Sequence, residues 1–247
     1  MPGRTPVPGG ASLPPGRAAA FIEARTRRSA VPLVPEIELF LSHAEPTALW
    51  EQTERELGRA DLAPPFWAYP WAGGIALARY ILDHPERVAG QNVLDMAAGS
   101  GLVAIAAALA GAAHVTASDI DPMAAAAIGL NSRANDVRVT VTVTDLLASG
   151  TLRAEGGDIT ADLVLVGDAW YERRLAHRML AFLGRARDAG ARALIGDPGR
   201  TYLPPGGLRA LASYAVPVWP GLEDAEVKQT TVWEPLSESA GCRRRLD

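Results

Sequence analysis

The chain of 247 residues has few residues of the kinds that build disulfides and metal sites. It contains one cysteine, Cys242, and four histidines that are scattered along the sequence. A single cysteine excludes an internal disulfide framework and any site built from several cysteines, so a reducing, cytoplasmic setting is expected. The histidines do not cluster as metal ligands do, and no metal is expected.

The sequence also lacks long apolar runs and an excess of basic charge. No stretch approaches the roughly 18 apolar residues that span a bilayer, and the N-terminus lacks the apolar segment of a signal peptide. Nucleic-acid affinity requires clustered basic residues, whereas the formal net charge is -4. We therefore expect a soluble cytoplasmic protein that binds neither membranes nor nucleic acids. The oligomeric state is left open.

Composition divides the chain into four segments. Residues 1–16 contain five prolines and four glycines and predict a disordered tail, and residues 237–247 predict a second, solvated tail. Residues 17–84 predict an N-terminal cap with helices over about 18–30 and 44–58, followed by the aromatic stretch PPFWAYPWAGG and a further helix. Residues 85–236 are expected to form the core domain.

The core segment alternates between short β-rich runs and helical runs. Strands are predicted over 91–95, 113–118, 137–143, 161–167 and 191–196, with helices near 100–110, 122–135 and 171–189. This alternation is typical of a parallel sheet with helices on both faces. A helix is also expected near 206–213. The last two apolar runs, SYAVPVWPG and VKQTTVWEPL, are too close for a crossover helix and predict an antiparallel edge hairpin.

The stretch VLDMAAGSGLVAIAAALAG, residues 93–111, predicts a buried strand, a glycine turn and a helix. Gly99, Gly101 and Ala104 satisfy the G-x-G-x-x-A pattern of dinucleotide sites, and Asp119 ends the next strand, where a ribose-binding carboxylate belongs. The free N–H groups of the helix N-terminus can receive a phosphate or a carboxylate. A phosphate-binding P-loop is excluded, because the chain has no G-K-[ST].

Asp95 distinguishes between the remaining ligand classes. It precedes Gly99 by four residues, so its negative charge would repel a pyrophosphate and attract an ammonium group. No tyrosine is followed four residues later by lysine, which excludes the proton relay of short-chain dehydrogenases. These observations favour a nucleoside ligand without phosphate over a nicotinamide dinucleotide, and leave an oxidoreductase as the weaker alternative.

The pattern D-x-x-x-G-x-G, followed by Asp119 and Asp145 after the next two strands, resembles the S-adenosylmethionine site of class I methyltransferases. That resemblance implies a Rossmann-like α/β fold with a seven-stranded, mostly parallel sheet, an antiparallel edge hairpin and an N-terminal helical cap. The turn would receive the methionine carboxylate, Asp95 the amino group, Asp119 the ribose and Asp145 the adenine. The implied cofactor-binding residues are Trp71, Asp95, Ala97, Gly99, Gly101, Asp119, Ile120, Asp145, Leu146 and Gly167. Alternatively, Asp95 and Asp145 are helix caps or turn residues.

Several further stretches resemble the seven-strand protein-lysine methyltransferases, which carry D-x-x-Y after the fourth strand. They are PPFWAYPWAGG, ASDIDPMAAAAIGLN, LVLVGDAWYE, LIGDPGR and TTVWEP. The resemblance is nearest to the electron transfer flavoprotein β-subunit lysine methyltransferase family, whose bacterial relatives are often labelled nicotinamide N-methylase-like, and it runs from about Phe21 to Pro235. It implies that the β subunit of this flavoprotein is the protein substrate. In GDAWYE a tryptophan replaces the family's usual phenylalanine.

The D-x-x-Y residues of this chain are Asp168 and Tyr171. They follow the strand expected beside the first one, at the edge where ligands of open α/β sheets bind, so both are expected to face the methyl group and its acceptor. Asp168 would orient the amine, or act as its base, and Tyr171 would narrow the channel. The alternative is that Asp168 caps the next helix.

Other residues are candidates for the walls of the site. Trp71 occupies the position of the family's cofactor-lid tryptophan, and Trp67, Tyr69 and Trp170 would either line the pocket or pack the cap onto the sheet. Asp197 and Arg200 would shape the acceptor side, or simply form a turn around Pro198. A small-molecule N-methyltransferase acting on a heteroaromatic amine is the alternative enzyme, and a non-catalytic cofactor-binding module is the alternative from another class.

Overall fold

The computed structural model describes residues 15–58, 60, 62–148, 153–154, 157–219, 222 and 225–236. Most of the tail predicted over residues 1–16 and the whole of that over 237–247, with Cys242, lie outside this part of the chain. The last two residues of the first predicted tail, Pro15 and Gly16, belong to the first helix, α1 (Pro15–Arg25).

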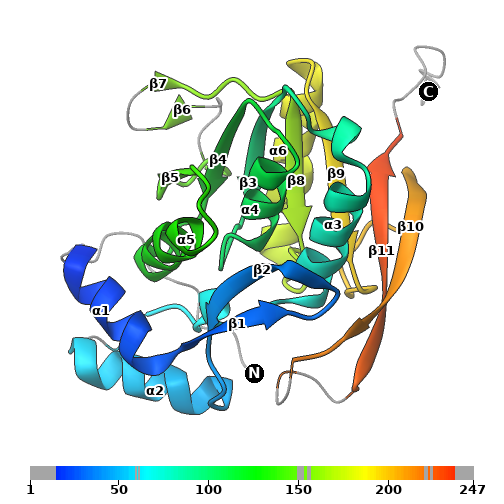
Figure 1. The fold of residues 1–247 in the computed structure, drawn as a ribbon. Helices are drawn as coiled ribbons and strands as arrows, with labels where there is room; N and C mark the ends of the chain where they lie inside the picture. The colour runs from blue at the N-terminus through cyan, green and yellow to red at the C-terminus, as the bar shows by residue number, and fades with distance from the viewer. Residues whose placement is uncertain are drawn as a thin grey trace.

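A seven-stranded sheet runs through the middle of the molecule (Figure 1), in the order β10-β11-β9-β8-β3-β4-β5. Neighbouring strands from β9 to β5 are parallel, whereas β11 is antiparallel to both β9 and β10. This arrangement confirms the predicted parallel sheet and its antiparallel edge hairpin. The strands are β3 (Asn92–Met96), β4 (His114–Ser118), β5 (Thr140–Thr142), β8 (Leu163–Gly167), β9 (Arg192–Asp197), β10 (Leu208–Pro217) and β11 (Val227–Pro235).

Helices cover both faces of the sheet (Figure 1), and alternate side chains of β8 pack against the helices on each face. Successive side chains of a strand point to opposite faces. Leu163 and Leu165 accordingly pack into the core beneath α3, α4 and α5, while Val164 and Val166 pack into a second core beneath α6. These helices are α3 (Ala72–Asp83), α4 (Leu102–Leu109), α5 (Pro122–Ala134) and α6 (Arg173–Asp188). The central strands β3 and β8 are therefore buried on both faces, as their apolar sequences predict.

The N-terminal cap contains a β-hairpin besides its helices. After α1, strand β1 (Arg27–Val31) pairs with β2 (Val34–Leu41), and α2 (Pro46–Leu57) and the short helix η1 (Phe66–Ala68) follow. The helix expected over 18–30 is therefore wrong beyond Arg25. The sequence RRSAV has an antiparallel partner in VPEIELFL, and such pairing overrides weak helical propensity.

Two asparagines, Asn131 in α5 and Asn135 directly after it, attach this hairpin to the core. The backbone N–H of Phe40 donates to Asn131 Oδ1 at 2.8 Å, and that of Glu38 donates to Asn135 Oδ1 at 3.0 Å. Asn135 Nδ2 donates back to the Glu38 carbonyl at 2.7 Å. Two backbone N–H groups at the edge of β2 thus donate to side-chain amides at the C-terminal end of α5, which attaches the cap to the core.

The helix expected near 206–213 is also wrong. Residues Leu208–Pro217 form β10, which pairs with β11 over its whole length apart from a register shift between Ala210 and Ala212. Two shorter strands, β6 (Arg153–Ala154) and β7 (Gly157–Asp158), form a separate small hairpin, and η2 (Pro85–Arg87) precedes β3. Among the described residues, none of the helices has both the length and the apolar character needed to cross a membrane.

Candidate active site

The glycine turn between β3 and α4 has a backbone that favours glycine. Gly99 has φ 52° and Gly101 has φ 81°, and Ala97 shares the left-handed conformation with φ 54°. A Cβ on Gly101 would also lie 3.1 Å from the side chain of Ile128 on α5, so this glycine is required by conformation and by space. The turn confirms the strand, turn and helix predicted from residues 93–111.

Asp95 lies at the carboxyl end of β3 and is 1% exposed. Its Oδ2 accepts the backbone N–H of Ala104 at 3.0 Å, so the carboxyl group caps the first turn of α4, as the alternative interpretation anticipated. Burial, and then the nearby negative charge of Asp119, raises the pKa of Asp95 to about 8. An ammonium group beside this carboxylate would relieve the cost of its burial, which is the chemistry expected for the amino group of S-adenosylmethionine.

Asp119 follows β4 and is tied to the same turn. Its Oδ2 accepts the backbone N–H of Gly99 at 2.8 Å and its Oδ1 accepts that of Asp121 at 3.0 Å. Burial raises the pKa of this carboxyl group as well. The next residue, Ile120, is half exposed. Two desolvated carboxyl groups at adjacent strand ends fit a ligand that carries an ammonium and hydroxyl donors, and the turn leaves no Lys or Arg side chain for a phosphate.

Asp145 and Leu146 follow β5, but the contacts of Asp145 are structural. Its Oδ1 accepts the backbone N–H groups of Leu147 and Ala148, both at 3.1 Å, as a cap would. Its carboxylate also forms an ion pair with Arg178 of α6 at 2.6 Å, which sequence reasoning did not anticipate. Leu146 is buried in the core beneath α6. A contact between Asp145 and an adenine stays a prediction.

Asp168 follows β8, is 6% exposed and has φ 60°, a strained conformation for a residue other than glycine. Its Oδ2 accepts the backbone N–H of Gly73 at 2.9 Å, and Arg200 donates Nε to Oδ1 at 2.6 Å and Nη2 to Oδ2 at 3.2 Å. The suggestion that Asp168 caps the next helix is wrong, because Glu172 caps α6. Asp168 instead caps α3.

Glycines allow the start of α3 to pack directly against the ends of β8 and β9. A Cβ on Gly73 would overlap the Gly196 carbonyl oxygen and lie 2.6 Å from the backbone nitrogen of Asp168. A Cβ on Gly167 would lie 2.9 Å from the Cα of Gly74. The predicted site residue Gly167 is therefore needed for packing of α3 against β8, whatever else it contacts.

Tyr171 belongs to a cluster of three aromatic rings that connects the D-x-x-Y motif with the aromatic segment before α3. Its ring centroid lies 5.4 Å from that of Phe66, which lies 5.7 Å from that of Trp71, and Trp71 Nε1 donates to the Phe66 carbonyl at 2.9 Å. Desolvation of the phenol, followed by the charges of Asp119 and Asp168, raises the pKa of Tyr171. The phenol thus lies within electrostatic reach of both carboxylates, while the residue as a whole is 46% exposed.

Phe66 is a site residue that sequence reasoning did not single out. It is 36% exposed although its ring contacts those of Trp71 and Tyr171, and its carbonyl oxygen would lie 3.8 Å from a Cβ on Gly99. The available signal was its place five residues before Trp71 in the aromatic segment. By contrast, Trp67, Tyr69 and Trp170 are fully buried, which favours packing over a role in the pocket wall.

The last residue of β9 is a second acid beside Asp168. Asp197 is 1% exposed, and its Oδ1 accepts the backbone N–H groups of Gly199 and Arg200, both at 2.7 Å. Its buried Oδ2 has no hydrogen-bond partner among the described residues. Burial, assisted by the charge of Asp168, raises the pKa of Asp197 to about 6. The predicted turn is confirmed, and it also presents Arg200 to Asp168.

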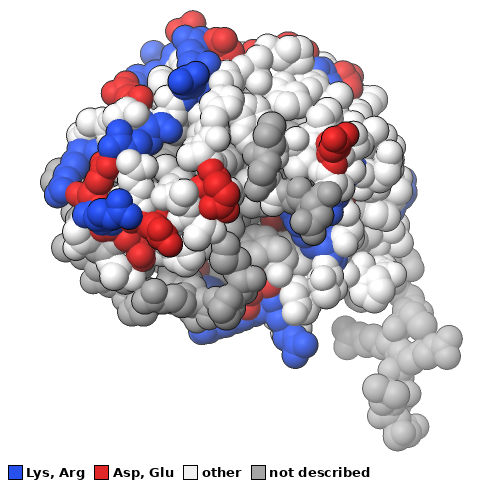
Figure 2. Space-filling model, turned by 90° about the horizontal axis from the view of Figure 1, so that it is seen from below, with Lys and Arg blue, Asp and Glu red and all other residues white. Residues whose placement is uncertain are grey.

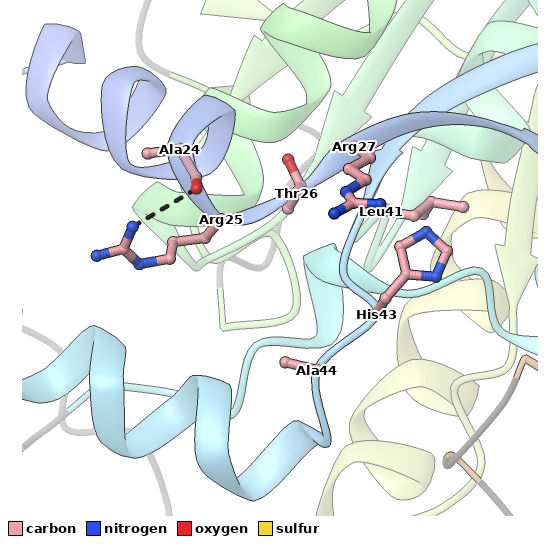
Figure 3. Close-up of a pocket in the computed structure, with 7 residues that line it drawn as sticks. All are labelled: Ala24, Arg25, Thr26, Arg27, Leu41, His43 and Ala44. Atoms are coloured by element: carbon pink, nitrogen blue, oxygen red, sulfur yellow. Dashed lines mark hydrogen bonds between the residues drawn. The ribbon is translucent and has the colours of Figure 1, made fainter.

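A separate hollow of about 340 Å³ lies between the end of α1 and the segment after β2 (Figure 3). It is lined by Ala24, Arg25, Thr26, Arg27, Leu41, His43 and Ala44, none of which was predicted as a site residue. Figure 2 views the molecule from the end at which α1 and α2 lie, where acidic and basic side chains alternate over the two helices. Within the described part of the chain, His, Cys, Asp and Glu form no group that could hold a metal ion.

Comparison with known proteins places this arrangement among methyltransferases. The family model of ribosomal protein L11 methyltransferase matches residues 77–166. The electron transfer flavoprotein beta subunit lysine methyltransferase of Rattus norvegicus is 36% identical over 224 residues, which are 87% of this chain and 83% of that protein. The Homo sapiens protein of the same name is 39% identical over 203 residues, 80% of this chain and 72% of that one.

The fold has a counterpart among solved structures. A methyltransferase structure from Pyrococcus horikoshii matches with a TM-score of 0.51 at 13% identity, covering 76% of this chain and 99% of that one. At this identity the match supports the fold alone.

Proposed function

Since this chain belongs to the electron transfer flavoprotein beta subunit lysine methyltransferase family, and is an S-adenosylmethionine-dependent protein-lysine methyltransferase, we propose that its acceptor is a lysine of that flavoprotein's beta subunit. One geometric observation supports methyl transfer at the strand ends. The rings of Trp71, Phe66 and Tyr171 contact one another in series, with centroid separations of 5.7 and 5.4 Å, and so connect the segment beside the glycine turn with the D-x-x-Y motif.

On the cofactor side, the proposal assigns each part of the ligand to a chemical partner. Asp95 would hold the ammonium, Asp119 the ribose hydroxyls, and the N–H groups of the turn around Gly99 and Gly101 the carboxylate. When bound, S-adenosylmethionine supplies an electrophilic methyl group on a sulfonium. The remaining assigned contacts are Trp71, Ala97, Ile120, Asp145, Leu146 and Gly167.

On the acceptor side, Asp168 would hold the lysine nitrogen by a hydrogen bond, and the rings of Tyr171 and Phe66 would enclose its methylene chain. The nitrogen must be neutral and in line with the methyl group when it attacks. Asp168 is fixed from α3 by Gly73 and from the β9 turn by Arg200, so its carboxylate needs little reorganisation to orient the amine.

The test is label transfer from radiolabelled S-adenosylmethionine to purified flavoprotein and to total lysate protein. The wild type is compared with Asp168→Ala and Asp95→Ala, and with Asp188→Ala as a matched control at the exposed end of α6. Label in the beta subunit that requires Asp95 and Asp168 but not Asp188 supports the proposal. Label confined to small molecules would indicate the heteroaromatic-amine alternative, and no transfer at all would indicate a non-catalytic module.

A further inference from the structure

Arg200 already occupies the carboxylate that is proposed to meet the acceptor amine. Its guanidinium forms two hydrogen bonds to Asp168, whose side chain is 3% exposed, while the side chain of Arg200 is 20% exposed. Paired geometry of this kind holds a guanidinium and a carboxylate in one relative orientation. The buried acid of the site is therefore neutralised by an internal cation before any substrate arrives.

This pairing matters because the reacting lysine must lose a proton. An uncompensated carboxylate beside a lysine favours the ammonium form and raises the pKa of that lysine, whereas a neighbouring guanidinium opposes this effect. Strong binding of the ammonium would therefore slow the reaction. A site that is nearly neutral can hold the amine by a hydrogen bond without stabilising its protonated form.

The other charged and titratable groups around Asp168 come from three elements. The β9 turn contributes Asp197, which interacts with Asp168 and with Arg200. The segment after β8 contributes Tyr171 and Glu172, and the segment after β4 contributes Asp119, whose charge acts on the same phenol. The first turn of α3 contributes the N–H of Gly73 and no charged side chain. Arg200 is the basic group among these, so its removal would leave the acids uncompensated.

Resting on the proposed acceptor function, we propose that Arg200 is a positioning residue of the acceptor site. It fixes the orientation of the Asp168 carboxylate and offsets its charge, so that the incoming lysine becomes neutral before methyl transfer. Arg200 touches neither the methyl group nor the lysine nitrogen in this account, and acts only through Asp168.

The experiment measures kcat and the acceptor KM between pH 6.5 and 9.5 for the wild type, Arg200→Gln, Arg200→Lys and Arg209→Gln. Arg209 pairs with Glu234 at the hairpin edge and serves as the charge-matched control. Loss of the guanidinium charge is expected to move the pH at which activity rises upward by about one unit. At pH 7 the Gln variant then loses about tenfold in kcat, with KM unchanged or lower, and recovers at pH 9. Arg200→Lys retains the charge but not the paired hydrogen bonds, so the pH at which its activity rises should match that of the wild type while its kcat falls by a similar factor at every pH.

A purely structural role would give a different pattern. Equal loss of activity at every pH in Arg200→Gln, or a profile of Arg200→Lys that shifts with that of Arg200→Gln, would overturn the inference. If circular dichroism shows that Arg200→Gln does not fold, Arg200→Lys decides. A one-unit shift in the pH at which its activity rises would overturn the inference, and an unchanged pH supports it. If the wild type labels another lysate protein instead of the flavoprotein, the proposed acceptor fails, and the same series on that protein still decides the role of Arg200.

Discussion

The backbone N–H of Gly73 donates to the Asp168 carboxylate at 2.9 Å, across 95 residues of sequence. Asp168 follows β8, and Gly73 lies in the first turn of α3, two residues after Trp71 in the aromatic segment. The D-x-x-Y motif is therefore joined to the segment that covers the glycine turn. Any change that separates α3 from the sheet should disturb both sides of the proposed site.

Gly73→Ala should expose this dependence. The added Cβ would lie 2.6 Å from the backbone nitrogen of Asp168 and overlap the Gly196 carbonyl, both of which are rigid backbone atoms. Overpacking of this kind typically costs 1–3 kcal/mol. We expect the free energy of unfolding, measured with urea, to fall by about 2–3 kcal/mol. Gly184→Ala on α6, where a Cβ would meet nothing within 4 Å, is the control and should raise stability by about 0.5–1 kcal/mol.

Asp95 should make cofactor binding depend on pH. With a pKa of about 8 in the free protein, the carboxyl group must release a proton before it pairs with an ammonium. The affinity for S-adenosylhomocysteine, measured by calorimetry, should therefore rise by up to about tenfold per unit between pH 6 and 8. Asp95→Asn should bind at least tenfold more weakly at pH 8, with a flatter profile. Identical pH profiles for the two proteins would show that Asp95 does not receive the amino group.

Asp197 should reduce stability at neutral pH. Its pKa, raised to about 6, means that the native protein binds more protons than the unfolded chain between about pH 4 and 6. Its contribution to the free energy of unfolding therefore declines as pH rises through that window and stays low above pH 6. Relative to Asp197→Asn, the wild type should lose about 1–3 kcal/mol between pH 4 and 7. A difference in the free energy of unfolding between the two proteins that does not change with pH would contradict this expectation.

Phe66→Ala should separate activity from stability. The side chain is partly exposed, so its loss should cost only about 1 kcal/mol of unfolding free energy, yet it would remove the ring contacts of both Tyr171 and Trp71. We expect the turnover rate to fall about tenfold in a label-transfer assay. Leu109→Ala, at a similarly exposed apolar position at the end of α4, should leave the rate unchanged. Equal effects of the two substitutions would remove Phe66 from the site.

Local patterns were enough to predict the central sheet. Apolar runs and glycine turns placed β3, β4, β8 and β9 within two residues of their observed ends. These strands lie inside the sheet between two layers of helices, so their sequences are apolar and easily recognised. The helix predicted over 18–30 is correct up to Arg25 and wrong for the residues that form β1, and the helix predicted near 206–213 is wrong from Leu208 onward. In both segments the strand partners that decide the structure lie elsewhere in the sequence. Edge strands carry weaker periodicity, which explains why both errors fall there.

The candidate site was predictable in its composition but not in its contacts. The aspartates at the strand ends follow from the α/β pattern, since the carboxyl ends of parallel strands share one edge. The ion pairs of Asp168 with Arg200 and of Asp145 with Arg178 join residues 32 and 33 positions apart, and no local spacing indicates them. The role of Asp168 as the cap of α3 also depends on tertiary packing through glycines.

The most direct test of the account is the mass of the flavoprotein beta subunit after incubation with this protein and S-adenosylmethionine, followed by mapping of the modified peptide. We predict an added methyl group, or several, on a lysine of that subunit with the wild type and with Asp188→Ala, and none with Asp168→Ala. An unmodified beta subunit under conditions in which the wild type binds S-adenosylhomocysteine, or modification that persists without Asp168, would contradict it.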